Sequence, residues 1–193
     1  MKKALALIFA IIMVVTCFTA CGNTEDSSGV FKIPEESLDG VEYGSFSEFT
    51  AIDLNGKKVT EKIFKGKKLT MINIWATFCG PCINEMPSLA ALNKEYADKD
   101  FQVIGIVCDV NYSGGGYDSS LYQTAVEITE YTGADYTNLL PSNSLDFIKL
   151  REVYSVPETI FVDENGNVIA QNYVGSRSYE SWKAIVDSIL AEM

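Results

Sequence analysis

The chain has 193 residues, of which 47% are hydrophobic and 21% charged, with a formal net charge of −11 at pH 7 and no histidine. An acidic chain of this kind is not expected to bind nucleic acid by neutralising phosphates, or anionic lipid by charge attraction. An apolar N-terminal segment is followed by about 150 residues, which is the usual length of one domain.

The first twenty residues are predicted to be a secretory signal peptide. Lys2 and Lys3 form a short positive region, and Ala4–Val15 is the apolar run behind it. The residues that follow, Thr19-Ala20-Cys21, resemble the lipobox of bacterial lipoproteins, in which the cysteine is lipidated and becomes the mature N-terminus. The resemblance implies cleavage after residue 20, a lipid on Cys21, and a lipid-anchored protein on the extracytoplasmic face of the bacterial cell membrane.

The same segment has a second interpretation, a transmembrane anchor. The apolar or small residues from Ala4 to Ala20 are near the short limit for a span, which needs about 20. Either interpretation leaves the same domain outside the cytoplasm. Residues 21–45 are rich in Ser, Gly, Asp and Glu and are predicted to be a flexible tether, because they bury too little apolar surface to offset the entropy of ordering. Residues 46–193 are predicted to form the folded domain.

Beyond the tether, apolar runs alternate as strands and helices. Strands are predicted at residues 49–53, 57–60, 69–75, 101–108, 135–140, 159–162 and 168–174. Helices are predicted from Cys79 to Lys99 and at residues 119–132, 145–153 and 178–193. Asp163-Glu164-Asn165-Gly166 is a hairpin signature between the last two strands. This order predicts an α/β fold with a central mixed sheet and helices on both faces.

Cys79-Gly80-Pro81-Cys82 follows the apolar strand predicted at Leu69–Trp75 and opens the first helix. Glycine tolerates the dihedral angles of a tight turn, and proline suits the start of a helix because its missing N–H has no partner there. The helix N-terminus stabilises a thiolate on the first cysteine. A second thiol three positions later is placed to resolve a mixed disulfide, so the motif is typical of thiol-disulfide exchange.

Two other interpretations of the pair are a structural disulfide and half of a zinc site. Zinc normally takes four ligands, from two such pairs or from one pair and histidines, and the chain has no histidine. The other cysteines are single. Cys17 leaves with the signal peptide, and Cys108 ends an apolar run and is expected to be a small buried residue, with a resolving or regulatory role as the alternative. We therefore expect no metal site.

Residues 46–193 resemble the thioredoxin superfamily, and within it the TlpA/ResA-like membrane-anchored thiol-disulfide reductases. Three motifs carry the resemblance: Trp75-Ala76-Thr77-Phe78-Cys79-Gly80-Pro81-Cys82, Glu85-Met86-Pro87 and Val156-Pro157-Glu158-Thr159. Phe78 departs from the pattern, since many relatives have tryptophan there, but it keeps an aromatic side chain. The family implies a thioredoxin-like fold, protein disulfides as substrates, and no cofactor beyond the redox-active Cys79–Cys82 disulfide.

The resemblance implies three catalytic residues. Cys79, nearest the helix start, is expected to be the nucleophile and the more exposed sulfur, and Cys82 the resolving thiol. Glu85 lies three residues past Cys82 and so on the same helix face, and in the family this acid lies near the active site. A buried carboxyl there has a raised pKa and is able to pass a proton to the leaving thiolate. The alternative is an exposed helix carboxylate.

The expected substrate-binding residues surround the cysteine pair and are Trp75, Phe78, Gly80, Pro81, Val156, Pro157 and Glu158. X–Pro bonds are cis in only about 5–6% of cases. The family nevertheless implies a cis Pro157 opposite the cysteines, where the backbone of Val156 pairs with an extended substrate. Glu158 either contributes a charge or hydrogen bond to the site or is simply solvated.

The sequence therefore predicts an extracytoplasmic protein-disulfide reductase for exported proteins, a monomer recharged by a membrane thiol electron donor. Gly80-Pro81 between the cysteines resembles the reducing thioredoxins, whose potential is about −270 mV. A disulfide oxidase or isomerase on the same fold is the alternative within the enzymes. A non-catalytic thioredoxin-like binding module is another alternative, which the presence of both cysteines disfavours. A copper-delivering relative would need a histidine, and the chain has none.

Overall fold

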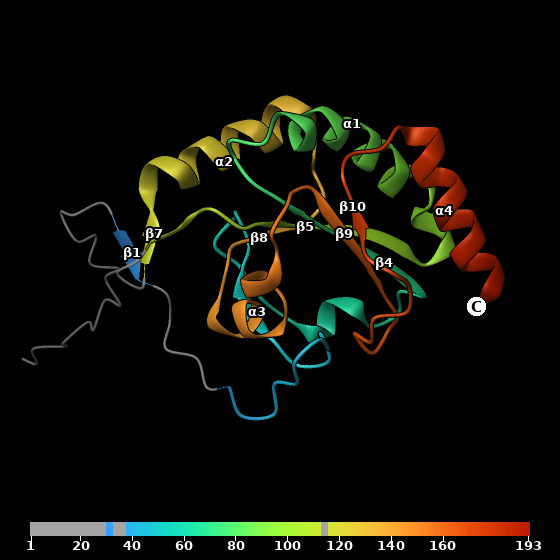
Figure 1. Ribbon diagram of the computed structural model, residues 1–193, viewed down its shortest axis with the longest axis horizontal. Coiled ribbons are helices and arrows are strands. Elements are labelled where there is room, and N and C mark those ends of the chain that lie inside the picture. The colour runs from blue at the N-terminus through green and yellow to red at the C-terminus, as the bar shows by residue number, and fades with distance from the viewer. Residues whose placement is uncertain (1–29, 33–37, 113–115) are drawn as a thin grey trace, which may run out of the picture.

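The computed structural model describes residues 30–32, 38–112 and 116–193 (Figure 1). The predicted signal peptide and Cys21 lie outside these residues. Within the described part of the chain, none of the helices has the length and apolar character needed to cross a membrane. One stretch of the predicted tether forms a strand: β1 (Val30–Lys32) pairs antiparallel with β7 (Gly116–Asp118). Val30 and Phe31 are strand-forming residues within a segment rich in Ser, Gly, Asp and Glu.

A five-stranded mixed sheet forms the centre of the domain, in the order β10-β9-β4-β5-β8. Its strands are β4 (Leu69–Trp75), β5 (Phe101–Val107), β8 (Asn138–Leu139), β9 (Glu158–Val162) and β10 (Tyr173–Val174). β4, β5 and β8 run parallel, whereas β9 is antiparallel to both β4 and β10. Because Ile74 pairs with Glu158, the carboxyl end of β4 lies beside the amino end of β9. The cysteine motif and Pro157 are therefore at the same edge of the sheet.

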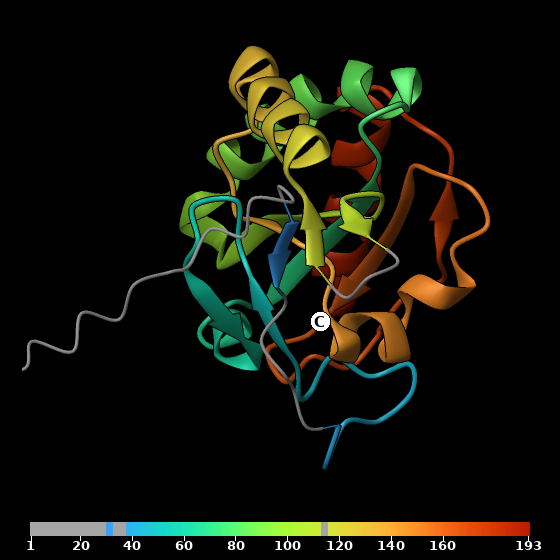
Figure 2. The ribbon, with the colours of Figure 1, turned by 90° about the vertical axis from the view of Figure 1, so that its left-hand side faces the viewer.

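Helices cover both faces of this sheet (Figures 1 and 2). One face carries α1 (Gly80–Glu95), α2 (Ser119–Thr132) and α4 (Tyr179–Glu192), and the other carries α3 (Asn143–Ile148). Side chains of β4 alternate between two cores. Met71 and Trp75 pack in the core that contains residues of α1, α2 and α4, whereas Ile72 and Ile74 pack on the α3 side. The predicted mixed sheet with helices on both faces is confirmed.

Shorter elements complete the domain. They are the hairpin strands β2 (Thr50–Ile52) and β3 (Lys58–Thr60), the strand β6 (Asn111–Tyr112), and 3-10 turns at Glu61–Phe64, Ala97–Lys99 and Leu150–Glu152. Three predicted elements are too long, and the helix predicted at residues 145–153 is instead α3, which ends at Ile148, followed by the 3-10 turn Leu150–Glu152. The first α-helix ends at Glu95 because the chain tightens into a 3-10 turn before β5. The strands expected at 135–140 and 168–174 shrink to β8 and β10. In the second case Val168 and Ile169 still contact β9, through an isolated bridge to Val162 and a hydrogen bond from the Ile169 N–H to the Phe161 carbonyl, but the exposed Gln171 and Asn172 interrupt the pairing before β10.

Candidate active site

The cysteine pair is a disulfide at the first turn of α1. The two sulfurs are 2.06 Å apart, and Cys79 is the N-cap residue, with its Sγ accepting a hydrogen bond of 3.2 Å from the backbone N–H of Cys82. Cys79 is 6% exposed and Cys82 is fully buried. The more exposed sulfur thus lies where an N–H group and the helix dipole favour a thiolate once the bond is reduced.

The turn that leads into the motif is held by a residue that the sequence reasoning did not identify. Asp109, just beyond β5, accepts hydrogen bonds from the Thr77 backbone N–H (3.0 and 3.1 Å) and from Thr77 Oγ1 (2.6 Å). Asp109 could have been predicted from its position just after β5, the strand beside β4. Functional groups of parallel sheets gather at the carboxyl ends of the strands. Asp109 therefore positions the turn two residues before Cys79.

The segment before β9 closes the site from the opposite side. The Val156–Pro157 peptide bond is cis, as predicted, and the carbonyl oxygen of Val156 lies 3.6 Å from Cys79 Sγ. Phe78 is 78% exposed, and Gly80 and Pro81 are also exposed. Most of the predicted substrate-binding residues therefore surround the more exposed sulfur on the protein surface.

Two predicted substrate-binding residues lie elsewhere. Trp75 is fully buried and donates from Nε1 to Asn138 Oδ1 at 3.1 Å, so it supports the site from below and does not touch a partner. Glu158 is 5% exposed, pairs with Lys149 Nζ at 2.7 Å and accepts from Asn172 at 2.8 Å. Of the two interpretations of Glu158, simple solvation is wrong, because the carboxylate is buried and its ion pair and hydrogen bond offset part of the cost of desolvation.

Glu85 is buried, at 3% exposure, so the alternative of an exposed helix carboxylate is wrong. Burial raises the pKa of Glu85, while three hydrogen bonds oppose that shift. Oε1 accepts from Asn73 Nδ2 at 3.0 Å, and Oε2 accepts from the Arg177 backbone N–H at 3.0 Å and from Trp182 Nε1 at 3.2 Å. Desolvation is the larger effect, so the neutral acid persists above its usual pH range.

The residues that hold Glu85 were missed by the sequence reasoning. Asn73 could have been noticed in the sequence, because it is the one amide in the apolar run of β4. In the structure its side chain also donates a hydrogen bond to Thr159 Oγ1 at 3.1 Å. Its Oδ1 is one of two buried side-chain atoms without a hydrogen-bond partner in the described residues, the other being the hydroxyl of Tyr136. Arg177 and Trp182 left no signal, because they lie about one hundred residues away and reach Glu85 only through the packing of α4.

Cys108 is half-buried at the end of β5 and contacts both cores. Burial, with a smaller contribution from the neighbouring Asp109 carboxylate, raises the pKa of its thiol to about 11. A thiol with so high a pKa is almost entirely protonated at neutral pH and is a poor nucleophile. This agrees with the expectation of an inert apolar side chain and not with a resolving role.

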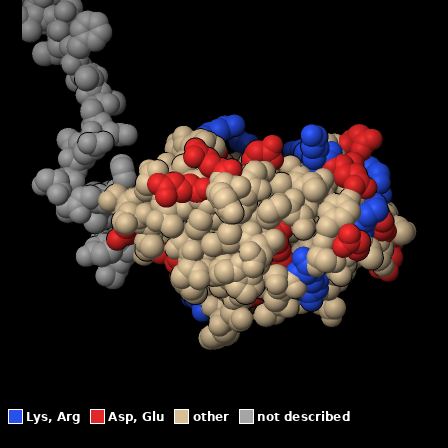
Figure 3. All heavy atoms as spheres, turned by 90° about the horizontal axis from the view of Figure 1, so that it is seen from above, with Lys and Arg blue, Asp and Glu red and all other residues tan. Residues whose placement is uncertain are grey.

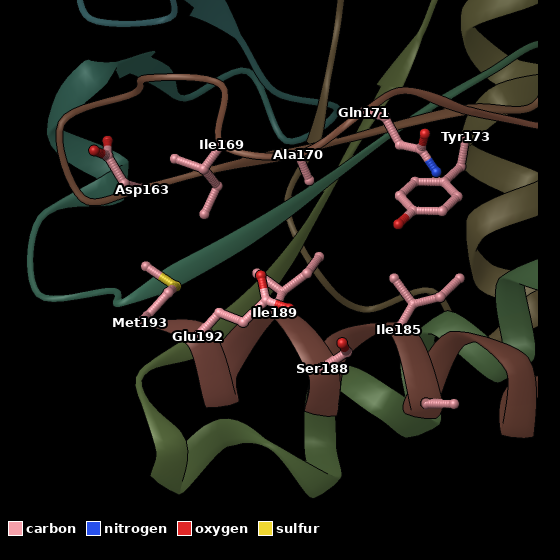
Figure 4. A pocket seen from close by; sticks show the side chains of 11 residues that line it. Asp163, Ile169, Ala170, Gln171, Tyr173, Ile185, Ser188, Ile189, Glu192 and Met193 are labelled. Atoms are coloured by element: carbon pink, nitrogen blue, oxygen red, sulfur yellow. The ribbon is translucent and has the colours of Figure 1, made fainter.

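The surface outside the cysteine motif has a groove and a group of ion pairs. A groove of about 680 Å³ lies between the β9–β10 connection and α4, lined by Ile169, Ala170, Tyr173 and Ile189 among others (Figure 4). None of its lining residues belongs to the predicted site. On the face in Figure 3, acidic and basic side chains mingle over one end. Lys183 on α4 pairs with Glu95 on α1 and with Asp187 on α4. Within the described residues, no cluster of side chains is suited to a metal ion.

Comparison with known proteins agrees with this geometry. Residues 42–186 match the Redoxin family. Thiol-disulfide oxidoreductase ResA of Bacillus thuringiensis subsp. konkukian is 29% identical over 98% of this chain and 99% of its own length. Thiol:disulfide interchange protein DsbE of Vibrio cholerae is 30% identical over 76% of this chain and 72% of its own length.

A solved structure shows the same fold. The thiol:disulfide interchange protein of the thioredoxin family from Chlorobium tepidum has a TM-score of 0.60 at 24% identity, covering 77% of this chain and 97% of that chain. The fold agreement, the family match and the disulfide at the first turn of α1 lead to one conclusion. The chain belongs to the Redoxin family and is a ResA-like thiol-disulfide oxidoreductase of the thioredoxin superfamily.

Proposed function

We propose that the protein reduces disulfides of exported proteins outside the cytoplasm. The observation that carries the proposal is the Cys79–Cys82 disulfide, with its more exposed sulfur at the helix N-terminus and 3.6 Å from the Val156 carbonyl. Gly80 and Pro81 between the cysteines, and the lack of any histidine, favour a reducing pair over a strongly oxidising one.

The reaction needs two exchange steps. The Cys79 thiolate attacks one sulfur of the partner disulfide, forms a mixed disulfide and releases the other partner sulfur as a thiolate that takes up a proton. The Cys82 thiolate then attacks Cys79 Sγ, re-forms the internal disulfide and releases the second partner sulfur. The partner gains two electrons and two protons. A membrane thiol donor returns them to the pair, and no further cofactor takes part.

The partner is proposed to bind as an extended segment beside Val156 and Pro157. The backbone of Val156 is close to Cys79, and the exposed Phe78 offers an aromatic surface next to the reacting sulfur. Gly80 and Pro81 leave the approach open because neither carries a bulky side chain. The protein acts as a monomer, because the site is complete within one chain.

The reduction potential tests the direction of electron flow. Equilibration with glutathione or dithiothreitol buffers is expected to give a value near that of thioredoxin, about −270 mV. The physical reason is a thiolate stabilised by one helix N-terminus, without a histidine to stabilise it further. A potential above about −170 mV would assign the protein to the oxidases or isomerases instead.

The location is tested separately. Processing before Cys21 is proposed to give a lipidated protein on the outer face of the cell membrane. Replacing Cys21 with alanine is expected to abolish labelling by a radioactive or clickable fatty acid and to leave residues 1–20 attached. Cys17→Ala is the matched control, which should label normally. Labelling that persists in Cys21→Ala would contradict the lipoprotein, and an uncleaved, unlabelled native protein would favour a transmembrane anchor.

A further inference from the structure

The connection between β10 and α4 crosses the buried carboxylate of Glu85. The connection starts at Val174, which pairs with Glu158, and ends at Ser178, the N-cap residue of α4. Between them, the backbone N–H of Arg177 donates to Glu85 Oε2 at 3.0 Å. Trp182 Nε1, one turn into α4, donates to the same oxygen at 3.2 Å. One carboxylate oxygen is thus held jointly by this connection and by the first turn of α4.

The side chain of Arg177 holds the same segment in its conformation. Its Nη1 donates to the carbonyl oxygens of Gly175 at 2.7 Å and Val174 at 3.4 Å. Its guanidinium also lies 5.0 Å from the ring centroids of both Tyr173 and Trp182. Gly175 has a φ of +86°, which only glycine adopts readily. The arginine therefore closes a tight backbone loop around its own charge.

The loop is also bonded to the edge where a partner is proposed to bind. The backbone N–H of Gly175 donates to the carbonyl oxygen of Pro157 at 2.9 Å. A continuous path of hydrogen bonds thus runs from Pro157 through Gly175 and Arg177 to Glu85. Glu85 is therefore connected to the segment at Val156–Pro157, which lies beside Cys79.

We propose that Arg177 is a positioning residue for Glu85: it clamps residues 174–177 so that its own backbone N–H reaches the carboxylate, and it places a positive charge beside that group. The effect of Arg177 on catalysis rests on the proposed function, in which Glu85 donates a proton during disulfide exchange. The clamp itself is a separate, measurable property of the folded protein.

The charge of Arg177 opposes the effect of burial on the pKa of Glu85. Desolvation raises the pKa of Glu85, whereas the hydrogen bond from the Arg177 backbone and the charge of its side chain lower it. The other elements around Glu85 present Cys82 on α1, Asn73 on β4, Trp182 on α4 and Tyr136 before β8. None of these is a cation, so Arg177 supplies the positive charge that limits the rise in pKa.

The test is a titration of the Glu85 carboxyl by carbon-13 NMR in the oxidised protein, with Glu85→Gln identifying the resonance. Arg177→Met is expected to raise the midpoint by about half a pH unit or more, because it removes a neighbouring charge and loosens a hydrogen bond. Arg177→Lys keeps the charge but not the two-carbonyl fork, so its midpoint should lie between those of Arg177→Met and the parent. Should Arg177→Met fail to fold, the lysine variant alone still tests the clamp.

Arg151→Met is the matched control. Arg151 also lies over an aromatic ring, that of Phe147, at 4.5 Å, and bonds a backbone carbonyl, but it does not contact Glu85. The titration midpoint of Glu85 in Arg151→Met should equal that in the parent. Unchanged midpoints in folded Arg177→Met and Arg177→Lys would overturn the proposal. A shifted midpoint without any effect on exchange would uphold the clamp and reject the proton-donor role of Glu85.

Discussion

Cys79→Ser is expected to abolish disulfide reduction, whereas Cys82→Ser should retain the first step and stop at the second. Cys79 is the more exposed sulfur and caps α1, so a serine there removes the nucleophile. Cys82 is fully buried and so cannot attack a partner disulfide in its place. An insulin-reduction assay should show no turnover for either variant. Non-reducing electrophoresis should show mixed disulfides with partner proteins for Cys82→Ser alone.

The remaining thiol provides the internal control for this result. Cys108 is present in both variants, and the raised pKa of its thiol keeps it protonated. Cys79→Ser is therefore expected to show no adducts at neutral pH. The Cys79→Ser variant could instead form as many mixed disulfides as the Cys82→Ser variant. That result would mean that Cys82 or Cys108 is the attacking thiol, and the assigned order of the two steps would be wrong.

Glu85→Gln is expected to slow exchange and to change its pH profile. With its pKa raised by burial, Glu85 is a neutral acid at pH values where an exposed carboxyl is ionised, and it can donate a proton as the mixed disulfide resolves. Acid–base help is typically worth about 10²–10⁴-fold, and we expect the low end because thiol exchange is intrinsically fast. Stopped-flow rates against pH should lose the decline that the parent shows as Glu85 ionises.

Glutamine suits this test because it keeps the shape and the hydrogen bonds. Its oxygen can accept from Arg177 and Trp182, and the Asn73 amide can turn its unpaired Oδ1 toward the new NH₂ group. A rate and pH profile equal to those of the parent would reduce Glu85 to a structural carboxyl. Glu95→Gln, on the exposed part of α1, is the matched control and should leave the profile unchanged.

The stability of the same pair of proteins gives an independent check. A carboxyl with a raised pKa stabilises the fold fully below its unfolded pKa of about 4.3. That contribution is lost as the pH rises through the folded pKa. The free energy of unfolding of the parent minus that of Glu85→Gln should therefore fall as the pH rises above about 4.3 and through the folded pKa. Urea denaturation at several pH values measures the difference.

Much of the fold follows from local patterns in the sequence. The apolar run at Leu69–Trp75 is the central strand with the predicted ends, and the helix at Ser119–Thr132 has the predicted boundaries. Asp118 caps that helix with its side chain and Gly133 ends it at positive φ, so both boundaries are local. The cysteine motif and the cis proline could likewise be found, because each has a short signature.

The surroundings of Glu85 could not be predicted in this way. Its partners come from β4, from the β10–α4 connection and from α4, which meet only after the sheet has formed. The ion pair of Lys149 with Glu158 is hidden for the same reason. A carboxylate in a sequence is expected to be exposed by default, and only tertiary packing shows that Glu85 and Glu158 are buried. The sequence therefore predicts the reacting cysteines and the cis proline better than it predicts the residues that hold Glu85 and Glu158.

Both margins of the central sheet are strands of only two residues, β8 and β10. The margin at β8 is also covered, since Leu54 N–H donates to Asn138 O and Leu140 N–H to Ile52 O. Long open strand edges recruit other chains and seed aggregation. A protein that forms mixed disulfides brings other chains close to its own strand edges. These short margins permit a brief covalent encounter at one sulfur without offering a template on which a bound chain could assemble as β-structure.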